Sequence, residues 1–173
     1  MNFHWKETVA AAAVLAAISG GALAVTDTNF TYTAFKAGVF AIGPGDVIPE
    51  NNTISYTVNA NVLDTGGGCF VAPIHLPQDV WLYSVSTGLI SDVGSDPVVS
   101  LVRTAINNSA TTLNSGTLVD DTGSPKTLTF TITNNAFRLV KNDLYSYHVR
   151  ICMGVGDSLY GARVTYHYNS AGD

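Results

Sequence analysis

The sequence of 173 residues predicts an all-β fold, an antiparallel two-sheet β-sandwich, preceded by an N-terminal helical segment. Short runs rich in Thr, Val, Tyr, Ile and Phe recur along most of the chain, separated by clusters of Gly, Asn, Asp and Pro. No helical periodicity follows the N-terminal segment, so the strands should pair antiparallel. A chain of this size buries one face of each strand most easily in two packed sheets. A jelly-roll-like sandwich is the first expectation and an immunoglobulin-like one the second.

The N-terminal segment, residues 1–24, has the pattern of a secretory signal peptide. A basic residue precedes the alanine-rich apolar run from Val9 to Ile18, and Ala22-Leu23-Ala24 supplies the small residues of a cleavage site. Glu7 interrupts the pattern, and the alternative is a helix that stays attached and packs on the domain or on a neighbouring subunit. The run is shorter than the roughly 20 apolar residues that cross a bilayer. We expect removal of this segment, one secreted domain at residues 25–173 and no stable membrane span afterwards.

Each expected strand in the first half of the chain rests on a period-two alternation of side chains. Residues 30–35 alternate Phe, Tyr and Ala with Thr and Phe, and residues 53–58 place Ile, Tyr and Val on one face. Residues 70–76 contain a proline, which favours an edge strand or a bulge. Residues 80–87 put Trp, Tyr and Val on one side. Residues 37–52, with several glycines and prolines, are expected to form a long loop.

The second half of the chain continues the same alternation. Residues 98–106 follow a proline, and residues 117–119 form a short strand candidate. The clearest pattern is residues 127–133, where Leu, Phe and Ile point inward and threonines point outward. Residues 144–152 place Tyr, Val and Ile on one face, and residues 159–168 set Ala, Val and Tyr against Arg, Thr and His.

Composition excludes two classes of partner. The formal net charge is −5, and Lys and Arg never cluster. Nucleic-acid binding needs a basic stripe against the phosphates, and anionic lipid headgroups need the same kind of patch. Only 12% of residues are charged while 46% are hydrophobic, which argues against disorder.

The two cysteines, Cys69 and Cys152, are expected to form one disulfide in an oxidising compartment. Two separate buried thiols are the main alternative. A catalytic pair with His75 or His148 is a further one, although each of those histidines lies in a strand-like segment. Neither cysteine has the spacing of a metal site.

Four loop carboxylates are the candidates for a calcium site: Asp92, Asp96, Asp120 and Asp121. Calcium prefers six to eight oxygen ligands, which loop carboxylates and carbonyls supply. The spacing matches no EF-hand loop, and Asp is common in turns because it hydrogen-bonds its own backbone. No cofactor is expected unless these turns bind calcium.

No catalytic constellation is present, so no enzymatic activity is predicted. The glycines at residues 66–68 precede strand-like residues, whereas a phosphate loop precedes a helix. Glycoside hydrolysis needs two carboxyls across a cleft, and Glu50 is the only Glu after residue 24. The histidines at 75, 148 and 167 would form a zinc site only if their strands were neighbours. A Ser-His-Asp triad has its residue types but no Gly-x-Ser-x-Gly motif.

Aromatic side chains are the richest remaining feature. The candidates for a ligand or partner surface are Trp81, Tyr83, Tyr160 and Tyr168. Exposed aromatic rings on a sandwich face stack on sugars and are favoured at protein interfaces. Strand periodicity places most aromatic residues in the core instead, and Tyr160 and Tyr168, at strand ends, are the best candidates for exposure.

Two segments carry a family resemblance: GGGCFVAPIHLP at residues 66–77 and LYGARVTY at residues 159–166. They resemble a group of secreted bacterial proteins that pair a glycine-rich C-hydrophobic-x-A-P-x-x-L-P segment with a C-terminal Y-G-x-R-V-x-Y strand. The strand around Tyr145 to Tyr147 is similar too. The resemblance covers most of residues 25–173, implies a secreted β-sandwich and supplies no activity.

The sequence therefore predicts a non-enzymatic protein, secreted or at the cell surface, that acts through its surface in self-assembly, in the envelope or in adhesion. Its partners would be itself or other envelope proteins. The alternative is a carbohydrate-binding module that holds a polysaccharide through exposed aromatic rings, with or without calcium. A secreted hydrolase is the second alternative.

Overall fold

A computed structural model describes residues 30–59, 61–92, 94–119 and 122–171. The predicted signal peptide at residues 1–24 lies outside them. The described chain contains one short helix, α2 (Asn135–Arg138), and a series of strands, which are β1 (Phe30–Ile42), β2 (Ile48–Pro49), β3 (Tyr56–Asn59), β4 (Val62–Ile74), β5 (Trp81–Ile90), β6 (Val98–Ala105), β7 (Ala110–Thr117), β8 (Lys126–Thr131) and β9 (Tyr145–Ala171). Among these residues, no helix is long and apolar enough to cross a membrane.

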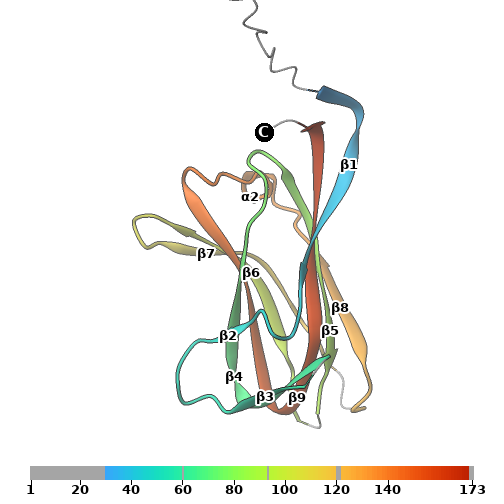
Figure 1. The fold of residues 1–173 in the computed structure, drawn as a ribbon, viewed down its shortest axis with the longest axis vertical. Coiled ribbons are helices and arrows are strands. Elements are labelled where there is room, and N and C mark those ends of the chain that lie inside the picture. The colour runs from blue at the N-terminus through green and yellow to red at the C-terminus, as the bar shows by residue number, and fades with distance from the viewer. Residues whose placement is uncertain (1–29, 60, 93, 120–121, 172–173) are drawn as a thin grey trace, which may run out of the picture. The chain divides into compact units, whose positions relative to one another are not determined.

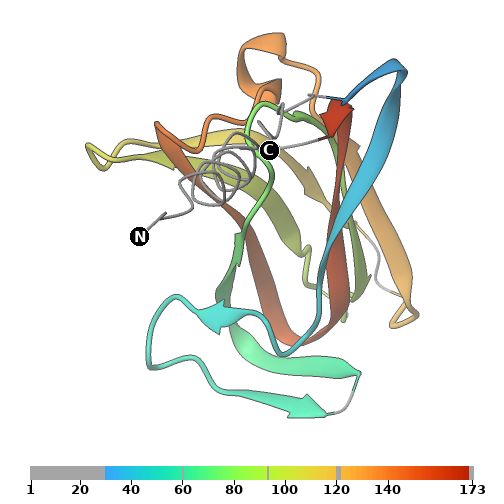
Figure 2. The same cartoon turned by 45° about the horizontal axis from the view of Figure 1, so that its top comes forward.

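Strand β9 organises the fold, because its two halves belong to different sheets. The first half, residues 145–153, lies between β4 and β6, and the second half, residues 158–171, lies between β1 and β5. The strand turns over between them, close to β3 (Figure 1; Figure 2). Gly154 and Gly156 lie at this corner, and Gly156 has a φ of +88°, which favours glycine.

The strand pairs define a jelly roll. Sheet I consists of β1, the second half of β9, β5 and β8 in that order. Sheet II consists of β4, the first half of β9, β6 and β7, with β2 and β3 paired to the other edge of β4. We count β9 as two strands and leave out β2 and β3. The first strand, β1, then pairs with the last, the second half of β9, and β4 pairs with the first half of β9. Further inward, β5 pairs with β8 and β6 pairs with β7. This is the jelly-roll order, so the first expectation is confirmed over the immunoglobulin-like one.

The core lies between the two sheets and is built by alternate residues of each strand. The predicted inward face of residues 127–133 is confirmed, since Ile132 is buried and Leu128 and Phe130 pack against the core. The largest fully buried side chains are Phe70, Leu63, Leu82, Leu89, Leu101, Ile151, Leu159, Val85, Val99, Val140, Val149 and Val164.

The predicted disulfide is confirmed. Cys69 of β4 and Cys152 of β9 are directly opposite each other in the ladder, with their Cα atoms 3.9 Å apart. Their neighbours Phe70 and Ile151 are fully buried, so the alternation of β-strands places the bond on the outer side of sheet II.

Several expectations about strand limits were wrong: β3 begins at Tyr56 and not at residue 53, β4 begins at Val62 and not at residue 70, and two further segments differ. Residues 37–42 are not a loop: they continue β1 and pair with residues 162–167 of β9. Their pattern is weak because only Phe40 and Ile42 face the core, while the outward positions are small or exposed. Residues 110–117, not 117–119, form the strand after β6, and this polar edge strand buries only Leu113. A strand that contributes so little to the core carries little hydrophobic signal.

Candidate functional site

The outer face of sheet I is the surface turned away from the core. In β9, Ala162 and Val164 are buried, so the alternation of the strand turns Arg163, Thr165 and His167 outward. Facing them from β5 are Ser86, opposite Arg163, and Trp81, opposite His167. This face holds two hollows, one towards each end of the strands.

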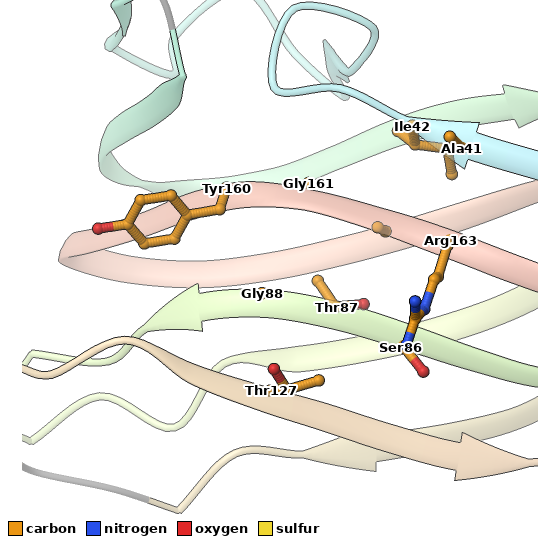
Figure 3. A pocket seen from close by; sticks show the side chains of 10 residues that line it. Ala41, Ile42, Ser86, Thr87, Gly88, Thr127, Tyr160, Gly161 and Arg163 are labelled. Carbon is orange, nitrogen blue, oxygen red and sulfur yellow. The ribbon is translucent and has the colours of Figure 1, made fainter.

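The first, which we call the glycine hollow, has a volume of about 450 Å³. Figure 3 shows the Tyr160 ring and the Arg163 side chain at opposite ends of the hollow, with Gly88 and Thr127 from neighbouring strands between them. Gly88 of β5 is directly opposite Gly161 of β9, so the floor of the hollow has no side chains. It is lined by Ala41, Ile42, Ser86, Thr87, Gly88, Thr127, Tyr160, Gly161, Ala162 and Arg163.

Glycine occupies the two floor positions for different reasons. Gly161 has a φ of +142°, and a Cβ atom there would lie 2.6 Å from the carbonyl oxygen of Ile42. Glycine at this position is therefore required by the close approach of β1 to β9. At Gly88 the nearest atom to a Cβ would be Cβ of Tyr160, at 3.4 Å, which is an ordinary contact. The fold does not need glycine at position 88, and its effect there is to keep the hollow open.

This difference predicts opposite outcomes for two alanine substitutions. Gly161→Ala is expected to lower the free energy of unfolding by about 2 kcal/mol, because it adds backbone strain and a clash with a carbonyl. Gly88→Ala should change it by no more than about 0.5 kcal/mol. Urea unfolding of both variants measures this, and equal losses would contradict the assignment.

The glycine hollow offers three kinds of contact to a ligand. The Tyr160 side chain is 39% exposed and supplies an aromatic surface. The Arg163 guanidinium has no hydrogen-bond or ion-pair partner within the described part of the chain. Hydroxyl groups come from β5 and β8, and the Ser86 hydroxyl accepts a hydrogen bond from Oγ1 of Thr129 at 3.0 Å.

The second, the aromatic hollow, is lined by Phe35, Trp81, Arg138 and His167 and has a volume of about 290 Å³. The His167 ring stacks on Tyr83, with centroids 4.6 Å apart, and more loosely on Phe35 at 6.4 Å. These rings cover one another's faces, so the ring that remains to flank a ligand is Trp81, which is 36% exposed.

Helix α2 positions Arg138 at the aromatic hollow. The Asn134 side chain caps the helix by accepting a hydrogen bond from the backbone N–H of Ala136 at 3.0 Å. Arg138, at the other end of the helix, donates from Nε to the carbonyl oxygen of Leu82 at 3.2 Å and places its guanidinium 5.8 Å from the Trp81 ring. The guanidinium is therefore held by one hydrogen bond and one cation–π contact.

Three of the four predicted surface aromatics lie on this face: Trp81 and Tyr83 at the aromatic hollow, and Tyr160 at the glycine hollow. Tyr168 does not join them. It is partly buried against the core and packs edge-to-face on Tyr32 at 5.8 Å. Its position in β9 has the same parity as Val164, which turns the side chain inward.

Sequence reasoning missed Arg138, Phe35 and the two floor glycines as site residues. Arg163 and His167 already stood on one face of the predicted strand, opposite Ala, Val and Tyr, and that alternation was the available signal. Nothing in the sequence brings Gly88 opposite Gly161, because this depends on the register of two strands 73 positions apart along the chain.

Of the four candidate calcium ligands, two lie within the described residues and two lie outside them. Asp92 and Asp96 are exposed, while Asp120 and Asp121 lie outside the described residues. Within the described residues, no group of three or more His, Cys, Asp or Glu is arranged to hold a metal ion. A fully buried carboxylate that the sequence did not single out, Asp157, accepts hydrogen bonds from the loop that carries Asp92.

The other chemical candidates lie on different surfaces. Glu50 forms a two-pronged ion pair with Arg150, with Nε–Oε1 and Nη2–Oε2 distances of 2.5 and 2.9 Å. Hydrogen bonding from Arg150 lowers the pKa of Glu50, which is the opposite of what a general acid of glycoside hydrolysis needs. Burial lowers the pKa of His148, which lies on sheet II, whereas His167 lies on sheet I.

No protein-family model matches the chain, and no curated protein matches it. Among solved structures, this chain is similar to the C-terminal family 6 carbohydrate-binding module of LamC, a laminarinase from Zobellia galactanivorans. The two share 14% identity, the match covers 74% of this chain and 99% of that chain, and the TM-score is 0.49. It is also similar to a family 6 module from Cellvibrio mixtus lichenase 5A in complex with cellotriose, with 14% identity, coverage of 72% and 95%, and a TM-score of 0.44. A third is infectious bursal disease virus, Gx strain, with 9% identity, coverage of 80% and 33%, and a TM-score of 0.41. Likenesses this distant do not place the chain in a family.

Proposed function

We propose that this protein is a non-enzymatic, extracellular carbohydrate-binding module whose ligand lies on the outer face of sheet I. The observation that carries the proposal is the glycine hollow, where an exposed Tyr ring, a guanidinium with no partner among the described residues and several hydroxyl groups surround the paired glycines of the floor.

These groups suit a sugar ring. The C–H surfaces of a sugar pack on an aromatic ring, and its hydroxyls exchange hydrogen bonds with a few fixed polar groups. Tyr160 supplies the ring, Arg163 supplies donors only, and the Ser86 hydroxyl both donates and accepts. The open floor at Gly88 lets the ligand approach the sheet backbone closely.

The extent of the face suits a chain rather than a single sugar. Tyr160 and His167 mark the two hollows on β9, and seven residues of strand separate them, or about 23 Å. A polysaccharide lying along the strands would contact both hollows. Weak contacts at two points of one ligand reinforce each other.

The test is retention on polysaccharides. The full-length protein should be retained on at least one insoluble or immobilised polysaccharide of a broad panel, and Gly88→Leu should lose retention because the new side chain fills the hollow. The matched control is Gly45→Leu, where nothing lies within 4 Å of an added Cβ. Retention that Gly88→Leu leaves unchanged, or no retention at all, would overturn the proposal.

Self-assembly is a second candidate, favoured by the edge of sheet I. Strand β1 pairs with β9 on one side and, within the described residues, with no strand on the other, and its Phe35 and Val39 are each 58% exposed. An open edge with apolar side chains can add a strand from another chain. Light scattering after size-exclusion chromatography separates the two functions: a monomer at all concentrations would count against assembly.

A further inference from the structure

We infer that the ligand is an anionic polysaccharide, one that carries carboxylate or sulfate groups along its chain. This inference rests on the proposed function and adds the class of ligand to it. It comes from the uneven distribution of charged side chains over the protein, because arginines line the candidate site although the net charge is negative.

The protein as a whole is acidic, with a formal net charge of −5. Among the described residues, however, no Asp or Glu lines either hollow on the outer face of sheet I. Each is lined by one arginine, Arg163 in the glycine hollow and Arg138 in the aromatic hollow. The described linings of the two hollows thus carry positive charge on a protein whose net charge is negative.

Two other cations of the described chain are neutralised by carboxylates. Arg150 pairs with Glu50, and Lys141 pairs with Asp79 at 2.6 Å. Arg163 is exposed, yet it has no such partner among the described residues. A guanidinium directed into a hollow with no carboxylate beside it is complementary to an anion, and it binds carboxylate or sulfate oxygens through two parallel hydrogen bonds.

Arg138 is also positioned to bind an anionic group of the ligand. Its Nε already donates to the carbonyl of Leu82, and Trp81 flanks its guanidinium. The remaining N–H groups are held in a fixed direction, so little side-chain freedom is lost when an anion binds. Trp81 offers the adjoining surface to the sugar ring that carries the anion.

The two arginines line different hollows, which lie at different positions along the strands. Arg163 lies four residues before His167, which shares the aromatic hollow with Arg138, and four residues of strand span about 13 Å. A polymer whose charged groups repeat along its length spans this distance, and this favours a polyanionic chain over a charged monosaccharide.

The experiment compares ligands that differ only in charge. Binding of the full-length protein is measured by affinity electrophoresis on polygalacturonate and on its carboxyl-reduced neutral derivative, and on a sulfated galactan and its desulfated derivative. At least one anionic polymer should bind at least tenfold more tightly than its neutral counterpart. Arg163→Gln and Arg138→Gln should each weaken that binding about tenfold, which is the loss of one charged hydrogen-bonding group.

The control for charge is Arg150→Gln, the same substitution on the outer side of sheet II, which should leave the affinity unchanged. Equal affinity for the charged and neutral polymers, with binding still abolished by Gly88→Leu, would overturn the anionic ligand and leave the proposed function standing. Binding that is insensitive to Gly88→Leu, or absent with every polymer, would overturn both. General attraction cannot account for a positive result, because protein and polymer are both negative.

Discussion

Replacing both Cys69 and Cys152 by alanine should lower the free energy of unfolding by about 4 kcal/mol. The bond joins residues 83 positions apart, and in the chain-entropy model a cross-link over a loop of this length stabilises by about 4–5 kcal/mol. The native state needs no rearrangement when the bond is lost, because β4 and β9 stay paired on both sides of it. Urea unfolding of the oxidised protein and the double variant measures the difference.

Reduction supplies the control for the disulfide. A reducing agent should shift the urea midpoint of the wild-type protein towards that of the double variant and leave the double variant unchanged. A loss below about 1 kcal/mol would mean that the unfolded chain is not restricted by the cross-link. The prediction that the bond restrains the unfolded state would then be wrong.

Asp157→Ala is expected to cost about 3 kcal/mol, the second largest effect. The Asp157 carboxylate is fully buried at the corner of β9 and accepts three hydrogen bonds: from the backbone N–H of Asp92 at 2.8 Å, from the Ser95 hydroxyl at 2.6 Å and from the backbone N–H of Gly154 at 2.7 Å. A hydrogen bond to a charged group contributes about 1.5–3 kcal/mol, and the contributions of bonds that share one carboxylate are not additive.

The matched control lies in the same loop. Asp96 is exposed, and Asp96→Ala should change the free energy of unfolding by no more than about 0.5 kcal/mol. Repeating both measurements with calcium also tests the sequence prediction of a calcium site in this loop. If Asp96→Ala proves as destabilising as Asp157→Ala, the assigned role of Asp157 is wrong.

The fold class was predictable because several strands alternate between apolar and polar residues. Residues 127–133 alternate so regularly that their inward side chains could be named in advance. The continuity of β9 could not be predicted, since Gly154 and Gly156 are typical of a turn between two strands and here mark a corner within one. Only the pairing of β4 with residues on both sides of this corner makes the strand continuous.

The candidate site was predictable side chain by side chain but not as a surface. Tyr160 was a candidate for exposure, Trp81 was a candidate for a ligand surface, and Arg163 was placed on the face of its strand opposite Ala162 and Val164. Their assembly around Gly88 and Gly161 depends on long-range register, and Arg138 arrives from a helix of four residues that carries no periodic signal. Tyr168 shows the limit of reasoning from strand ends, because its parity in β9 turned it inward.

The most direct test of the account is the location of bound carbohydrate on the protein. In an NMR titration of the isotope-labelled protein with oligosaccharides from the polymer it binds best, the largest shifts should fall on the amides of Gly88 and Gly161 and on Nε of Arg163. Smaller shifts are expected around Trp81 and Arg138. Shifts that gather instead on the outer side of sheet II, around Arg150 and the disulfide, would contradict the proposal that the outer face of sheet I is the binding site.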